Sequence, residues 1–68
     1  MNKTAKKRID ALTQNELLVY RTDLSNCKTR DEQLIKAGKM ICDMWILHWT
    51  SDDAEYLLKR AGVRLLYK

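Results

Sequence analysis

Recurring start signals for helices constrain the fold of this chain more than any other feature of its sequence. A threonine is followed three residues later by a glutamate at Thr13 and Glu16, and the same spacing returns at Thr29 and Glu32. In such a capping box the hydroxyl accepts a hydrogen bond from an unpaired backbone N–H, and the carboxylate reaches back to the threonine N–H. Ser51, followed by two aspartates, is a third start, because a cap hydroxyl and acids suit the positive end of the helix dipole.

The spacing of apolar residues agrees with these starts. The face of the first helix carries Leu17, Tyr20 and Leu24. A longer face after the second start carries Leu34, Ala37, Ile41, Met44, Trp45 and His48. Gly62 ends the third helix, because glycine readily takes the left-handed conformation that closes many helices. We therefore predict helices over about residues 14–25, 30–49 and 52–61.

These elements predict an all-α fold, a small three- to four-helix bundle with a central apolar helix. Residues 1–68 are expected to form a single domain, in which residues 1–12 are a basic N-terminal arm or a weak helix. The last residues fit a tail, a final turn or a short edge strand, because Val63, Leu65 and Tyr67 alternate along the chain.

The cysteine content and the N-terminus favour a cytoplasmic protein with reduced thiols. Two cysteines, Cys27 and Cys42, are few for a small secreted scaffold, and no apolar leader region follows the basic N-terminus. The longest strongly apolar run, residues 44–47, is far too short for a transmembrane segment. Residues 3–12 have the charge of a membrane-surface helix but only a thin apolar face.

The segment from Met40 to Trp49 is apolar around its whole circumference, with only Asp43 and His48 strongly polar. A helix of this kind is buried on all sides or faces a partner. A domain of about 60 residues buries only about 60% of the surface of its open chain, so cover is scarce. The segment indicates a protein–protein interface, either a homodimer seam or a partner groove, and the competing interpretation is a central core helix. Gly38, just before it, either permits another helix to approach closely or marks a break. The predicted partner-binding residues are Met40, Met44, Trp45, Leu47, His48 and Trp49.

The chain carries a net charge of +4, and its basic excess lies at both ends. The alternative hypothesis is a nucleic-acid-binding module that contacts phosphates through these ends, which requires them to meet on one face. Its residues are Lys3, Lys6, Lys7, Arg8, Lys59, Arg60 and Arg64. Two solvated basic ends explain the same pattern. A helix-turn-helix with its recognition helix at residues 40–49 is excluded, because that segment offers no Arg, Lys, Gln or Asn for base edges.

Catalytic and metal-binding patterns do not emerge from the sequence. His48 is the only histidine, and Cys42 and Asp43 lie at spacings that place them on other sides of a helix. The chain has no paired CxxC or HxxxH spacing and no glycine-rich phosphate loop. We therefore expect no catalytic residues, no metal and no cofactor. The leading hypothesis is a small non-enzymatic helical protein that regulates or inhibits a protein partner, with a homo-oligomer through the same surface as a further option.

Overall fold

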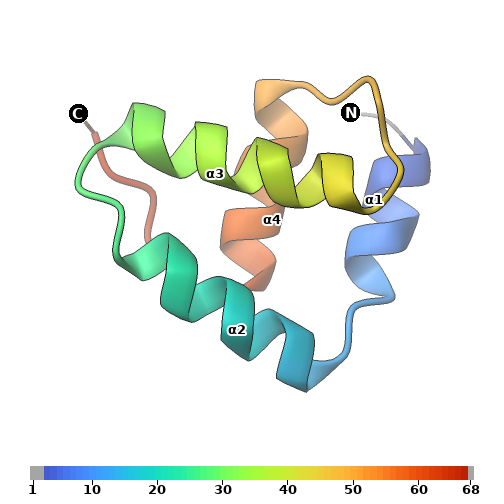
Figure 1. Ribbon diagram of the computed structural model, residues 1–68, viewed down its shortest axis with the longest axis horizontal. Coiled ribbons are helices and arrows are strands. Elements are labelled where there is room, and N and C mark those ends of the chain that lie inside the picture. Colours follow the sequence, from blue (N-terminus) through green and yellow to red (C-terminus); the bar gives the residue numbers. More distant parts are fainter. Residues whose placement is uncertain (1–2, 68) are drawn as a thin grey trace.

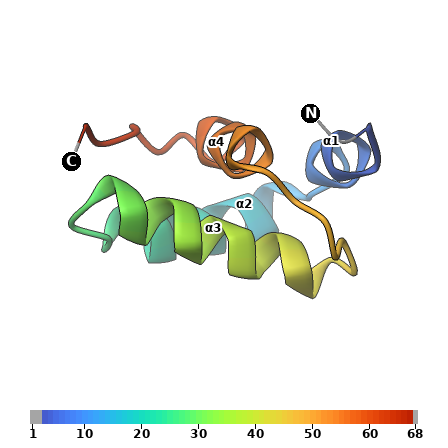
Figure 2. The same ribbon diagram turned by 90° about the horizontal axis from the view of Figure 1, so that it is seen from above.

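The computed structural model describes residues 3–67, which form four helices in two layers (Figures 1 and 2). The helices are α1 (Lys3–Asp10), α2 (Gln14–Ser25), α3 (Arg30–Asp43) and α4 (Ser51–Arg60). One layer holds α2 and α3, and the other holds α1, α4 and the C-terminal residues 61–67 (Figure 2). Residues 3–67 contain no strand, so the predicted all-α bundle is confirmed.

The predicted capping box of α2 is confirmed with both of its hydrogen bonds, whereas that of α3 has only the one accepted by the threonine hydroxyl. Thr13 Oγ1 accepts from the N–H of Glu16 at 3.2 Å, and Glu16 Oε1 accepts from the N–H of Thr13 at 3.1 Å. At α3, Thr29 Oγ1 accepts from the N–H of Glu32 at 3.1 Å. The Glu32 carboxylate, however, accepts from the N–H of Lys28 at 2.9 Å instead of closing the box.

The cap of α4 is Thr50, so the prediction of Ser51 was wrong by one residue. Thr50 Oγ1 accepts from the N–H of Asp53 at 3.4 Å, and Asp53 Oδ2 accepts from the N–H of Thr50 at 2.9 Å. A capping box needs a side-chain acceptor three residues after the cap. Asp53 meets this need for Thr50, while the residue three positions after Ser51 is Ala54, which has no acceptor.

The hydrophobic core lies where α3 crosses α4, with α1 against the side of α4 (Figure 1). Its largest fully buried apolar side chains are Ile9, Leu24, Ile41, Leu57 and Leu58. Ala5 and Ile9 of α1 are fully buried, so the apolar face of this basic helix is used within the fold rather than offered to a membrane surface. No helix within residues 3–67 has the length and apolarity needed to cross a bilayer.

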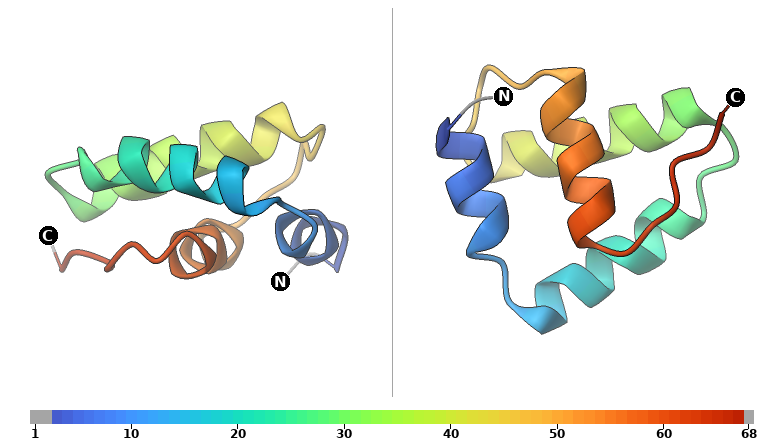
Figure 3. Two further views of the ribbon diagram at one scale, coloured as in Figure 1. Left: turned by 90° about the horizontal axis from the view of Figure 1, so that it is seen from below. Right: turned by 180° about the vertical axis from the view of Figure 1, so that it is seen from behind.

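After α4 the chain turns back at Gly62 and continues as an extended tail. Gly62 has φ +78°, and the next N–H, that of Val63, donates to the carbonyl of Leu58 at 2.9 Å, which confirms the predicted stop. Figure 3 shows the tail and α1 on opposite sides of α4. The sequence allowed a tail, a final turn or a short edge strand for these residues, and the structure shows a tail.

Gln33 of α3 holds this tail through both ends of its side-chain amide. Its Nε2 donates to the carbonyl of Arg64 at 2.9 Å, and its Oε1 accepts from the N–H of Leu66 at 2.8 Å. The side chain is only 2% exposed. A buried amide needs such partners, and the tail supplies both of them.

Replacing Gln33 with alanine should release the tail and lower the free energy of unfolding by about 1–3 kcal/mol, because the two backbone groups of the tail lose their partner. Urea unfolding measures the loss, and hydrogen exchange at the Leu66 amide reports the release. Gln14→Ala, at an exposed glutamine of α2, is the control and should leave this amide protected. Unchanged protection in Gln33→Ala would contradict the assignment.

Candidate functional site

The central helix ends at Asp43, six residues before its predicted end at residue 49. The N–H of Met44 donates to the carbonyl of Ile41, and the N–H of Trp45 donates to the carbonyl of Cys42, both at 3.0 Å. Trp45 then takes φ +65°, a left-handed conformation that ends the helix. A continued helix would leave this apolar segment exposed on several sides, whereas a loop can turn single side chains inward.

Residues 44–50 connect α3 to α4 and are called here the Trp45–Leu47 loop. Some of their side chains lie in the core and others lie in solvent. Trp45 is 85% exposed and Leu47 is 80% exposed, while Ile46 between them is 4% exposed. Ile46 therefore anchors the loop in the core, and its two neighbours project outward. Both are more exposed than the large apolar side chains Leu18, Val19 and Ile35 on α2 and α3, which are 57–60% exposed; among residues 3–67 only Tyr67 in the tail, at 87%, is comparable.

Contacts with other elements hold the loop in this form. The guanidinium of Arg8 in α1 donates a hydrogen bond to the carbonyl of Met44. The left-handed backbone of Trp45 costs about 1–2 kcal/mol for a residue other than glycine. Such a conformation persists only where the surroundings enforce it, and it is often found at functional sites. Arg8 and the anchor Ile46 provide that enforcement.

The remaining predicted partner-binding residues differ in their exposure to solvent. Met40 is buried at 6% exposure, Met44 is half-buried, and His48 is exposed. Trp49 is half-buried against α3, where a Cβ added at Gly38 would lie 2.1 Å from its Cζ2. The close approach expected at Gly38 is therefore that of an indole ring rather than of another helix.

The two basic ends are brought together only in part. Lys6 Nζ lies 3.4 Å from Asp10 Oδ2, and Arg60 Nε lies 3.6 Å from Asp10 Oδ1, so one carboxylate joins α1 to α4. Tyr56 of α4 also donates to Asp10, and the Lys6 ammonium lies 5.8 Å from its ring centroid. Arg64 belongs to the tail on the other side of α4 (Figure 3). The remaining predicted cations, Lys3, Lys7 and Lys59, are exposed.

The carboxylate of Asp10 should contribute to stability in acid. Its pKa lies below the usual value, mainly because Tyr56 donates a hydrogen bond to it and also because of the nearby cations Lys6 and Arg60. A carboxylate with a lowered pKa stabilises the fold above its unfolded pKa, and that stabilisation is lost as the pH falls through the folded pKa. Asp10→Asn should therefore be less stable than the parent at neutral pH and should lose less stability between about pH 5 and pH 2. Urea unfolding at several pH values tests this, with Asp23→Asn, outside the cluster, as the control. Parallel pH curves for parent and Asp10→Asn would contradict it.

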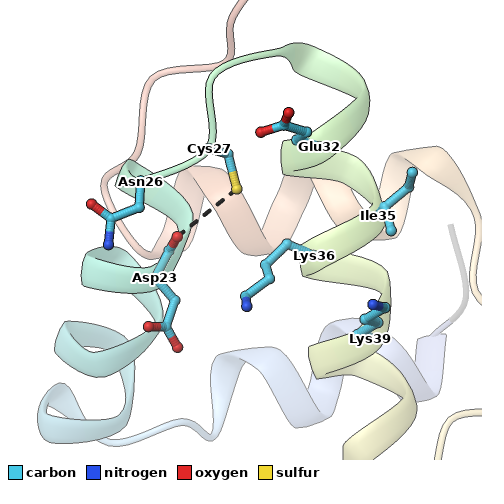
Figure 4. Close-up of a pocket in the computed structure, with 7 residues that line it drawn as sticks. All are labelled: Asp23, Asn26, Cys27, Glu32, Ile35, Lys36 and Lys39. Carbon is cyan, nitrogen blue, oxygen red and sulfur yellow. Dashed lines mark hydrogen bonds between the residues drawn. The ribbon is translucent and has the colours of Figure 1, made fainter.

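A depression between α2 and α3 contains Cys27 but lacks the features of a nucleophilic site (Figure 4). The thiol donates to the carbonyl of Asp23 at a sulfur–oxygen distance of 3.8 Å. Burial raises the pKa of the Cys27 thiol, and the charge of Glu32 acts in the same direction. A thiol with a raised pKa stays protonated and is a poor nucleophile. His48 lies in the loop at the opposite end of α3. Across residues 3–67, no group of three or more His, Cys, Asp or Glu side chains is placed to hold a metal ion.

The Trp45–Leu47 loop is therefore the most distinctive candidate site of this chain. The sequence predicted Trp45 and Leu47 among the partner-binding residues but placed them on a helix, together with the buried Met40. No protein-family model matches the chain, and no curated protein or solved structure matches it either.

Proposed function

We propose that this chain is a small non-enzymatic helical protein that binds another protein through the Trp45–Leu47 loop. The observation that carries the proposal is the pair of exposed side chains, Trp45 at 85% and Leu47 at 80%, on a loop that the fold holds in place. Tryptophan is enriched among the residues that dominate interface energies. Burying a large apolar side chain contributes about 1.5–3 kcal/mol, so each of the two is a sizeable part of a binding energy.

The shape of the loop favours a groove on the partner. Ile46 and the bond from Arg8 keep the loop ordered before binding, which reduces the entropy lost on association. A projecting pair fits a concave surface better than a flat one, as is usual for anchor residues in desolvated pockets. By filling such a groove, a chain of 68 residues would act as a regulator or an inhibitor of its partner.

A photo-crosslinking amino acid tests this proposal in cells. Leu47→p-benzoylphenylalanine should give one discrete adduct with another protein after irradiation. The matched control is Val19→p-benzoylphenylalanine, because Val19 is also an exposed apolar residue, at 59%, but lies on α2. The adduct from position 47 should disappear when Trp45→Ala is added. Equal adducts from both positions, or an adduct that survives Trp45→Ala, would refute the proposal. Sedimentation of the purified chain over a concentration series identifies the case in which the partner is a second copy.

Nucleic-acid binding is the second candidate, favoured by the placement of α1 beside α4. This packing brings Lys6 and Arg60 to one carboxylate, with the other cations of α1 nearby. Asp10 at the centre reduces the local positive charge, which is why we rank this function second. A gel-shift titration tests it: binding through phosphates weakens linearly with salt on logarithmic axes. No shift at low salt would exclude it.

A further inference from the structure

A depression of about 300 Å³ between α2 and the C-terminal end of α4 is lined by two positively charged side chains. Its polar lining is Gln14 and Arg21 from α2 together with Arg60 from α4. Three other depressions on the described surface each include at least one acid: Asp23 and Glu32 in one, Glu55 in another and Asp43 in the third. The lining of this one contains no acid, so its two guanidinium groups are not neutralised from within.

Both arginines have donors to spare. Arg60 uses its Nε toward Asp10 at 3.6 Å, outside the lining, and its side chain remains 43% exposed. No acid among residues 3–67 lies within ion-pair distance of Arg21. A guanidinium group has five N–H donors in a planar fork that suits the oxygens of phosphate. Two arginines from separate helices, each with unused donors, therefore line one small depression.

We propose that this depression binds the phosphate group of a small phosphate ester. Arg21 and Arg60 would hold the phosphate oxygens, and the Gln14 amide supplies a further donor. The rest of the lining, Leu17, Leu18 and Ala61, is apolar and offers a surface for the organic part of the ester. The volume lies at the lower end of the range for small-molecule sites, which fits a compact ligand. The Trp45–Leu47 loop takes no part in this site.

Phenyl phosphate and inorganic phosphate are the probes, titrated into the full chain with amide chemical shifts as the readout. Both should shift amides around residues 14–21 and 60–61, and phenyl phosphate should bind more tightly because its ring contacts Leu17 and Leu18. Arg21→Gln and Arg60→Gln should each weaken binding about tenfold or more, because a hydrogen bond to a charged group is lost. Arg30→Gln is the matched control, since Arg30 pairs with Glu55 at 2.9 Å outside the depression, and it should leave binding unchanged.

Asp10→Asn provides the opposite change and should strengthen binding, because it frees Arg60 and removes a nearby negative charge. Equal loss of affinity in Arg21→Gln and Arg30→Gln, or shifts spread evenly over the basic surface, would overturn the proposal. The same holds if phenyl phosphate produces no shifts. A titration with the single-stranded DNA hexathymidylate distinguishes a small phosphate ester from a nucleic acid as the source of the phosphate. If hexathymidylate binds more tightly than phenyl phosphate, and through the same two arginines, the proposal of a small ester is refuted.

Discussion

Replacing Ile46 with alanine should lower the free energy of unfolding by about 2–5 kcal/mol, the range for truncating a buried isoleucine. Trp45→Ala and Leu47→Ala, on either side of it, should each change this free energy by no more than about 0.5 kcal/mol, as is usual at exposed positions. The contrast arises because Ile46 is 4% exposed while its neighbours are 85% and 80% exposed. Urea unfolding followed by far-ultraviolet circular dichroism measures all three variants.

The same three variants separate folding from binding. Trp45→Ala and Leu47→Ala should fold like the parent, because neither side chain belongs to the core, and under the proposed function they should lose the partner. Ile46→Ala should lose both. If Trp45→Ala destabilises the chain as strongly as Ile46→Ala, the indole belongs to the core and the loop is not a docking surface.

Gly38→Ala should lower the free energy of unfolding by about 1–3 kcal/mol, although alanine is the better helix former by about 1 kcal/mol. The added Cβ would lie 2.1 Å from Trp49 Cζ2, closer than atoms can approach, so the indole has to move. Displacement of the ring also changes the tryptophan fluorescence. Measuring it in a Trp45→Phe background assigns the change to Trp49, the other tryptophan of the chain.

Two further variants control for this effect. Gly62→Ala tests glycine replacement without a clash: Gly62 has φ +78° and nothing within 4 Å of an added Cβ. It should cost about 1–2 kcal/mol through backbone strain and leave the Trp49 fluorescence unchanged. In a Trp49→Ala background, Gly38→Ala should become neutral or stabilising, because the obstacle is gone. Stabilisation by Gly38→Ala in the parent chain would show that Trp49 does not pack there.

The parts of the fold that depend on neighbours in sequence were predictable. The helix at residues 14–25 begins after Thr13 as expected, because its cap and its acceptor Glu16 lie within four residues of each other. The stop at Gly62 was predictable for the same reason, since glycine takes the left-handed conformation without the strain that other residues incur.

The end of the central helix was not predictable, because it depends on contacts between distant residues. No glycine, proline or asparagine marks the stop after Asp43, and a tryptophan takes the left-handed position instead. The bond from Arg8 to Met44 spans 36 residues, and the contact of Gln33 with the tail spans more than 30. Apolar periodicity alone continues the helix through residues 44–49, because the buried Ile46 and the exposed Trp45 have the same hydrophobic character.

Within residues 45–47 only the Ile46 side chain points inward, so under the proposed function the residues that support the fold are distinct from those that contact a partner. Under this proposal, substitutions at positions 45 and 47 would change which partner surfaces the chain binds and leave its core unchanged. Randomising position 47 with Ile46 and Arg8 retained should therefore yield variants of similar stability that differ, under the proposed function, in what they bind.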